Sequence, residues 1–174
     1  MKILSFGGST SSTSINRQLA NHAASLVPSA TVTDLDLRRF ELPIYSSDEE
    51  AANGVPAAAQ EFKALIESHD AIVVSLAEHN GSYSAAFKNL YDWTSRIDQN
   101  VWSNKAMLLM ATSPGGRGGA TVLAAAEATF PRMGADLKTT FSLPAFYENF
   151  SEEEGVTHAE FKAALEEAIA AFSA

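Results

Sequence analysis

Cysteine is absent from this chain of 174 residues. The absence excludes disulfide bonds, thiolate nucleophiles and sulfur-ligated metal sites, and it leaves the redox compartment open. No apolar run approaches the length of a membrane span, and the chain does not open with a charged segment followed by an apolar one, as a signal peptide does. We therefore expect a cytoplasmic protein with no membrane partner.

Basic residues are scarce as well. The chain has 12 lysines and arginines against 21 aspartates and glutamates, a formal net charge of −9. This balance argues against a nucleic-acid partner, because binding to phosphate backbones depends on clustered positive charge. Four histidines are scattered along the chain, and no set of potential ligands has metal-binding spacing. We expect no bound metal.

The hydrophobic residues, 46% of the chain, alternate between two periodicities. Apolar runs typical of strands occupy residues about 2–7, 31–37, 71–77, 106–111 and 133–141. Helical patterns occupy residues about 14–27, 56–68, 84–97, 119–130 and 157–172. Near-continuous apolar strands that alternate with helices predict an α/β fold, a three-layer sandwich with a five-stranded parallel sheet. No linker or repeat interrupts the pattern, so we expect a single domain over residues 1–174.

Ligands of such sheets bind beyond the carboxyl ends of the strands. The loop after the first strand, residues 7–16, is rich in glycine and hydroxyl groups and leads directly into a helix. The free N–H groups of a helix start favour an anion. The loop has neither the lysine of a Walker motif nor the G-x-G-x-x-G pattern of a dinucleotide site. A neutral cradle of this kind suits one terminal monophosphate, as in FMN, although an ordinary helix cap would explain the same residues.

Two further loops have unusual composition. Residues 77–84 read Ala-Glu-His-Asn-Gly-Ser-Tyr-Ser, and residues 112–119 read Thr-Ser-Pro-Gly-Gly-Arg-Gly-Gly. With the first loop, they resemble the motifs of the NAD(P)H-dependent FMN reductases, a flavodoxin-like family that includes quinone, chromate and azo-dye reductases. The matching positions are Gly8, Ser9, Ser14, Asn16, Glu78, Asn80, Gly81, Ser82, Lys88, Asn89, Asp92, Trp93, Ser95 and Arg96. Ser11 replaces an arginine of the family pattern, Ala77 a proline and His79 a tyrosine.

The resemblance implies a site and a cofactor. The FMN phosphate would be held by Ser9, Ser11, Ser14, Ile15 and Asn16 of the first loop. The isoalloxazine ring would lie against Glu78, His79, Asn80 and Gly81 on one side and Ser113, Gly115, Gly116 and Arg117 on the other. Flavin N5 would accept hydride from NADPH or NADH and pass electrons to a small-molecule acceptor, so no catalytic side chain is expected. The family also implies a homodimer or homotetramer, with the helix at 84–97 in the interface and the flavin near it.

Three alternatives stay open on the sequence. A flavodoxin-type electron carrier would bind FMN without its own NAD(P)H activity. A serine hydrolase of the SGNH type would use Ser9, but the expected Asp-x-x-His is missing because Gly155 stands three residues before His158. A flavin-free binding domain could share the fold, since fold alone does not determine function.

Overall fold

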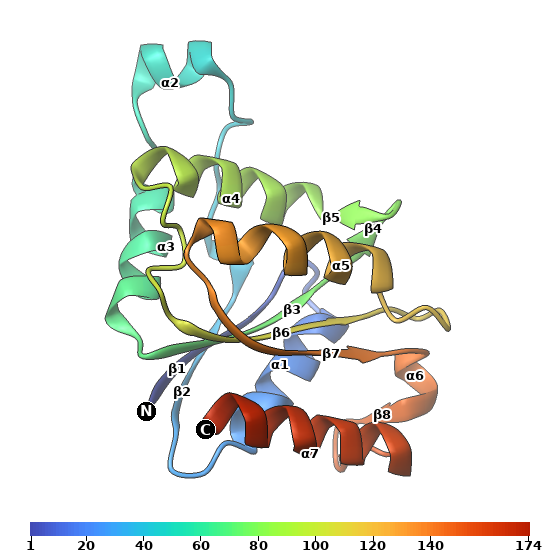
Figure 1. Ribbon diagram of the computed structural model, residues 1–174. Helices are drawn as coiled ribbons and strands as arrows, with labels where there is room; N and C mark the ends of the chain where they lie inside the picture. The colour runs from blue at the N-terminus through green and yellow to red at the C-terminus, as the bar shows by residue number, and fades with distance from the viewer.

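The computed structural model describes residues 1–174 and contains a five-stranded parallel sheet in the order β2-β1-β3-β6-β7 (Figure 1). The strands are β1 (Lys2–Gly7), β2 (Thr31–Leu35), β3 (Ala71–Leu76), β6 (Ala106–Thr112) and β7 (Asp136–Leu143). This sheet, with helices on both faces, confirms the flavodoxin-like three-layer architecture. The last strand begins at residue 136 rather than 133, because a short helical turn that ends at Gly134 occupies the first predicted positions.

Alternation along the central strand divides the core between the two faces of the sheet. Every residue of β3 is buried. Ile72 and Val74 point into one hydrophobic cluster with Phe6, and Val73 points into a second cluster with Ile3. Successive side chains of a strand point to opposite faces, so a strand covered on both sides is mostly apolar. The exception in β3 is Ser75, whose buried hydroxyl donates a hydrogen bond to Asn16. The near-continuous apolar runs of the sequence follow from this burial.

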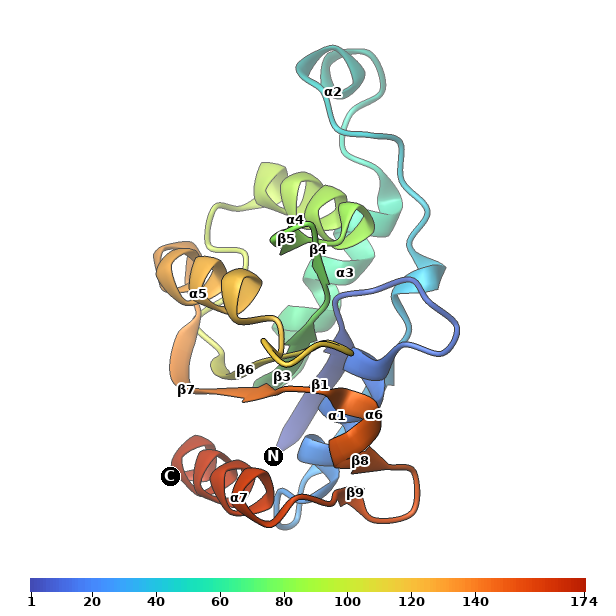
Figure 2. The ribbon, with the colours of Figure 1, turned by 90° about the vertical axis from the view of Figure 1, so that its right-hand side faces the viewer.

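Five long helices form the outer layers: α1 (Ile15–Ser25), α3 (Ala57–Ser68), α4 (Ala85–Ile97), α5 (Ala120–Thr129) and α7 (Ala159–Ser173). Helices α3, α4 and α5 cover one face of the sheet, and α1 and α7 cover the other (Figures 1 and 2). The hydroxyls of Ser14 and Ser84 cap the starts of α1 and α4 by accepting hydrogen bonds from backbone N–H groups of the first turn. All five helices were predicted, with ends that differ by a few residues.

Several short elements were not predicted. They are the helices α2 (Ser47–Asn53) and α6 (Phe146–Asn149), the hairpins β4 (Glu78–His79) with β5 (Ser82–Tyr83) and β8 (Phe150–Ser151) with β9 (Gly155–Val156), and the 3₁₀ turns Leu37–Arg39 and Phe130–Met133. Elements of this length show no hydrophobic period that a sequence pattern would reveal. Helix α2 buries no residue and projects from the body of the molecule (Figures 1 and 2). None of the helices combines the length and the apolar character needed to cross a lipid bilayer.

The exposed side of α4 carries two separate ion pairs. Lys88 binds Asp92 one turn later, with 2.7 Å between Nζ and Oδ1. Arg96, one turn after Asp92, pairs instead with Glu50 of α2 at 3.0 Å and lies over the ring of Tyr45. The second pair thus attaches the projecting segment to α4.

Candidate functional site

The loops after β1, β3 and β6 meet at the carboxyl edge of the sheet and enclose a cavity of about 250 Å³. Its walls are formed by Ser9, Ser11, Thr13, Ser14, Ile15, Asn16, Ala77, Glu78, His79, Thr112, Ser113, Pro114 and Tyr147. A larger hollow of about 430 Å³ lies between α1 and α7. That hollow shares no residue with the three loops, so the smaller, more polar cavity is the candidate site.

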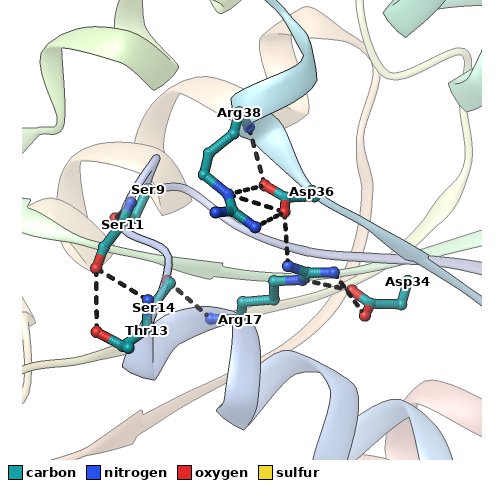
Figure 3. Close-up of polar contacts among 8 residues, drawn as sticks. All are labelled: Ser9, Ser11, Thr13, Ser14, Arg17, Asp34, Asp36 and Arg38. Carbon is teal, nitrogen blue, oxygen red and sulfur yellow. Dashed lines mark hydrogen bonds and ion pairs between the residues drawn. The ribbon is translucent and has the colours of Figure 1, made fainter.

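The first loop presents hydroxyl groups whose protons are free. The Ser9 oxygen accepts a hydrogen bond from the backbone N–H of Ser11 at 3.1 Å, and the Ser14 oxygen accepts one from that of Arg17 at 3.1 Å (Figure 3). Each hydroxyl can still donate its proton to a ligand. The backbone N–H groups of Ile15 and Asn16, in the first turn of α1, donate to no other group of the chain. The loop therefore offers several convergent donors to an anion.

Arg17 follows this loop but turns away from the cavity. Its guanidinium donates to Asp34 at 2.7 and 2.8 Å and to Asp36 at 2.9 Å (Figure 3). The side chain of Arg38 also donates to Asp36 and, with added attraction from the charge of Arg17, holds the pKa of that carboxyl well below its usual range. No lysine or arginine lines the cavity, since Ser11 occupies the place of the family arginine.

Asn16 connects the first loop to two strands of the sheet. Its Oδ1 atom accepts from the hydroxyl of Ser75 at 2.7 Å and from the backbone N–H of Thr112 at 3.1 Å. Its Nδ2 atom donates to the carbonyl of Thr112 at 3.2 Å. The side chain is buried, and these three bonds assign it a supporting role in the loop. A contact between Asn16 and a phosphate stays a prediction. The backbone N–H group of Asn16, which donates to no other group, is the atom that could make this contact.

Glu78 in the second loop caps a helix that is distant in sequence. One carboxylate oxygen accepts from the backbone N–H groups of Thr121 and Val122, both at 2.9 Å. These donors belong to the first turn of α5, where a negative charge is favourable. Glu78 thereby attaches the second loop to α5, the helix that follows the third loop. The hydroxyl of Ser84 adds a link to the first loop, because it donates to the carbonyl of Gly8 at 2.7 Å.

A tight hairpin shapes the second loop. Asn80 and Gly81 connect β4 to β5 and both have positive φ, 53° and 74°. Two such residues in succession suit a two-residue hairpin turn, for which Asn-Gly is a preferred sequence. The dipeptide was therefore a signal for β4 and β5 that the sequence interpretation did not use. The hairpin sets His79 at the cavity wall and leaves Asn80 and Gly81 outside the lining.

The third loop is fixed by contacts with the segment after β7. The carbonyls of Ser113 and Gly115 accept backbone hydrogen bonds from Phe146 and Ala145, at 3.1 and 2.9 Å. Arg117 donates to the hydroxyl of Thr121 at 2.8 Å and is exposed. Arg117 is thus not part of the cavity wall, and its contact with a flavin stays a prediction.

The cavity includes most of the predicted residues and some that were missed. Eight predicted residues line it: Ser9, Ser11, Ser14, Ile15, Asn16, Glu78, His79 and Ser113. Asn80, Gly81, Gly115, Gly116 and Arg117 lie in the same loops but outside the lining. The lining residues not predicted are Thr13, Ala77, Thr112, Pro114 and Tyr147. All but Tyr147 adjoin the predicted motifs. Tyr147 lies after β7, in a segment with no motif.

Comparison with known sequences settles the family. The sequence pattern of the NADPH-dependent FMN reductases matches residues 1–148. The chain belongs to the NADPH-dependent FMN reductase family. The differences from the family pattern at Ser11, Ala77 and His79 therefore occur within a family member. The name of the family contains both the flavin, FMN, and its reductant, NADPH.

Two named reductases resemble this chain over about two thirds of its length. The chain is 37% identical over 120 residues to a 2-hydroxy-1,4-benzoquinone reductase of Burkholderia sp., a match that covers 68% of this chain and 63% of that protein. It is 34% identical over 113 residues to a quinone reductase of Pseudomonas putida, a match that covers 64% of this chain and 60% of that protein. The matched segment thus spans about three fifths of the length of these relatives.

Solved structures give the same fold. The flavoenzyme NAD(P)H:(acceptor) oxidoreductase of Paracoccus denitrificans superposes with a TM-score of 0.77 at 27% identity, over 99% of this chain and 94% of that one. The apo form of an NADH:FMN oxidoreductase gives a TM-score of 0.71 at 19% identity, over 99% of this chain and 88% of that one. At that identity, the second likeness is one of fold alone.

Proposed function

We propose that this member of the FMN reductase family is an NAD(P)H-dependent flavin oxidoreductase. It would bind FMN in the cavity at the carboxyl edge of the sheet and transfer electrons from NADPH or NADH to a small acceptor such as a quinone or free flavin. The observation that carries the proposal is the first loop, whose free hydroxyl protons and helix N–H groups face a cavity that no lysine or arginine lines. Such a loop fits one monophosphate.

The residues present fit FMN. Ser9, Ser11 and Ser14, together with the N–H groups of Ile15 and Asn16, would hold its phosphate. The neighbouring wall at Ala77–His79 would lie against the ring system, and the hairpin fixes the course of this wall. No group of three or more histidine, aspartate or glutamate side chains in the structure is placed to hold a metal ion. When bound, FMN supplies the chemistry, because its ring accepts a hydride from a nicotinamide and yields electrons to an acceptor.

The protein residues would orient these molecules and limit the access of water. Glu78 keeps the second loop against α5, and Ser84 keeps it against the first loop. The Ser14 hydroxyl would donate to the phosphate while its oxygen caps α1. No side chain has to form a covalent bond to substrate, which is consistent with a chain that lacks cysteine.

The two alternative activities have less support. The named relatives are reductases rather than electron carriers. Reduction of the bound flavin by a nicotinamide alone would separate the reductase from a carrier. For a hydrolase, the nucleophilic serine would need a base, but the only hydrogen bond of the Ser9 hydroxyl oxygen comes from the backbone of Ser11, and no histidine hydrogen-bonds to it.

The decisive experiment compares FMN with riboflavin, which lacks the phosphate. We expect calorimetric titration to show tighter binding of FMN in the wild type, and Ser14→Ala to lose about 1.5–3 kcal/mol of that preference. Ser12→Ala is the matched control, because Ser12 belongs to the same loop but does not line the cavity. Equal affinities of the wild type for FMN and riboflavin would contradict the phosphate assignment. NADPH and NADH are then added in turn, and loss of the flavin absorbance reports reduction.

We also propose that the chain assembles into a homodimer or homotetramer through α4, as the family resemblance implies. A surface hollow of about 330 Å³ beside this helix, lined by Tyr83, Tyr91 and Arg132 among others, supports the proposal because the ring of Tyr83 is only partly buried there. Light scattering coupled to gel filtration would give the mass in solution. A monomer at micromolar concentration would contradict it.

A further inference from the structure

Tyr147 is an aromatic residue at the cavity whose position core packing does not explain. Its side chain is 72% exposed, yet it forms part of the same wall as Ser113 and Pro114. An exposed tyrosine gains little from the hydrophobic effect, which rewards removal of apolar surface from water. Apart from the imidazole of His79, its ring is the only aromatic group that lines the cavity.

Two backbone hydrogen bonds fix the segment that carries Tyr147 at the rim of the cavity. Ala145, two residues before it, has φ 45° and ψ 59°, a left-handed conformation that is unfavourable for a residue with a Cβ atom. The same residue donates its N–H to Gly115, and Phe146 donates to Ser113. Strained backbone persists where its surroundings impose it. Here two hydrogen bonds to the third loop impose the turn that begins α6.

Packing below Tyr147 adds to this anchoring. Phe146 is buried and stacks on Phe150, with 4.6 Å between the ring centroids. The ring of Tyr147 meets the edge of Phe146 at a centroid distance of 5.6 Å. Helix α6 follows the end of β7, so it lies at the same edge of the sheet as the β4–β5 hairpin and the loop after β6 (Figure 1). Phe146 is therefore buried in the core, and the adjacent Tyr147 lies at the cavity.

We propose that Tyr147 is a specificity-determining residue that packs against a planar aromatic electron acceptor of the quinone class. The inference rests on the proposed function. The overall reaction balances as NAD(P)H, a proton and a quinone giving NAD(P)⁺ and a hydroquinone, so the nicotinamide is oxidised by two electrons and the quinone reduced. A flat ring gains contact with the tyrosine face through aromatic stacking. A small inorganic oxidant such as ferricyanide gains no such contact.

The test compares two acceptors in the FMN-loaded protein. Replacement Tyr147→Ala should lower kcat/KM for 1,4-benzoquinone by about three- to tenfold more than it lowers kcat/KM for ferricyanide, the range of one aromatic contact. Tyr147→Phe retains the ring and should behave as the wild type. Ile44→Ala is a control for loss of an exposed apolar side chain, because Ile44 is 77% exposed and lies outside the cavity. The absence of cysteine removes thiol addition as a competing reaction of the quinone.

A binding measurement without turnover completes the test. Equilibrium dialysis of benzoquinone against the oxidised, FMN-loaded protein, with no nicotinamide, should give a Kd raised by the same factor in Tyr147→Ala. FMN affinity should be equal in all four proteins. Three results would overturn the proposal: unchanged quinone kinetics, equal losses with both acceptors, or weaker FMN binding, which would place Tyr147 in the cofactor seat. A wild type that binds no FMN refutes the proposed function itself and is recognised before any variant is made.

Discussion

Asn16 and Thr112 are joined by two hydrogen bonds that run in opposite directions. The Asn16 amide donates to the Thr112 carbonyl at 3.2 Å and accepts from the Thr112 N–H at 3.1 Å. The side chain thus pairs with the end of β6 much as a neighbouring strand would, although the two residues are 96 positions apart. The start of α1, which offers its N–H groups to the cavity, is therefore fixed to the end of β6, where the third loop begins.

Replacement Asn16→Ala should reduce the free energy of unfolding by about 2–4 kcal/mol, because it leaves the Ser75 hydroxyl and the Thr112 N–H buried without partners. Urea unfolding followed by circular dichroism measures the change. Asn53→Ala is the control, since Asn53 is exposed and bonds only within α2. A loss no larger than that of the control would refute the structural role of the Asn16 amide.

The close approach of β1 to α1 makes a second prediction. A Cβ atom on Gly7 would lie 2.4 Å from the backbone nitrogen of Arg17 and 2.8 Å from its Cα atom. Backbone atoms of a first helical turn cannot move aside without displacing the phosphate loop. Gly7→Ala should therefore destabilise the fold by about 1–3 kcal/mol, the usual cost of overpacking, and weaken FMN binding.

Gly116→Ala provides the comparison. Nothing lies within 4 Å of a Cβ atom at Gly116, and its φ is not positive. We expect an unfolding midpoint in urea close to that of the wild type. If the two alanine variants lost equal stability, close packing at Gly7 would not be the cause.

The first loop, residues 7–16, contains no lysine or arginine, and a substitution can introduce one. Ser11→Arg places a guanidinium where the family pattern has one, and Ser11 is exposed in the cavity wall. We expect FMN to bind about three- to tenfold more tightly at low salt, and the gain to shrink as salt screens the new pair. Wild-type affinity should vary little with salt, because neutral donors hold the phosphate.

Ser12→Arg tests whether position rather than net charge matters. It adds the same charge to the same loop, outside the cavity lining. Fluorescence titrations of FMN at several salt concentrations should show a small gain for this variant. Identical salt dependence in Ser11→Arg and Ser12→Arg would indicate a general charge effect.

The lowered pKa of Asp36 makes the free energy of unfolding depend on pH. Hydrogen bonds from Arg38 depress its pKa in the folded protein below that of the unfolded chain. The unfolded state therefore binds more protons at acid pH, so this stabilisation is complete above a pH of about 4 and is lost as the pH falls further. Asp36→Asn should lower stability at neutral pH and flatten its decline between about pH 4 and pH 2. Asp48→Asn, in the exposed first turn of α2, serves as the control in thermal melts across this range.

The sequence alone determined the succession of the five sheet strands and the five long helices, and the three loops that form the site. This was possible because burial leaves a periodic record: a strand covered on both faces, such as β3, is apolar at all but one position, and a helix with one buried face has apolar residues every three to four positions. Ser14 and the glycine-rich loops carry local signals of the same kind, since caps and tight turns depend on adjacent residues.

Only the tertiary structure decided which groups face the cavity and which face one another. Nothing near Glu78 in the sequence indicates that it caps α5, and nothing near Arg17 indicates that Asp34 and Asp36 draw it away from the phosphate loop. Tyr147 reaches the rim because α6 is bonded to a loop some 30 residues earlier. These contacts join segments that are distant along the chain, and their geometry depends on the order and twist of the strands between them, which no local pattern encodes.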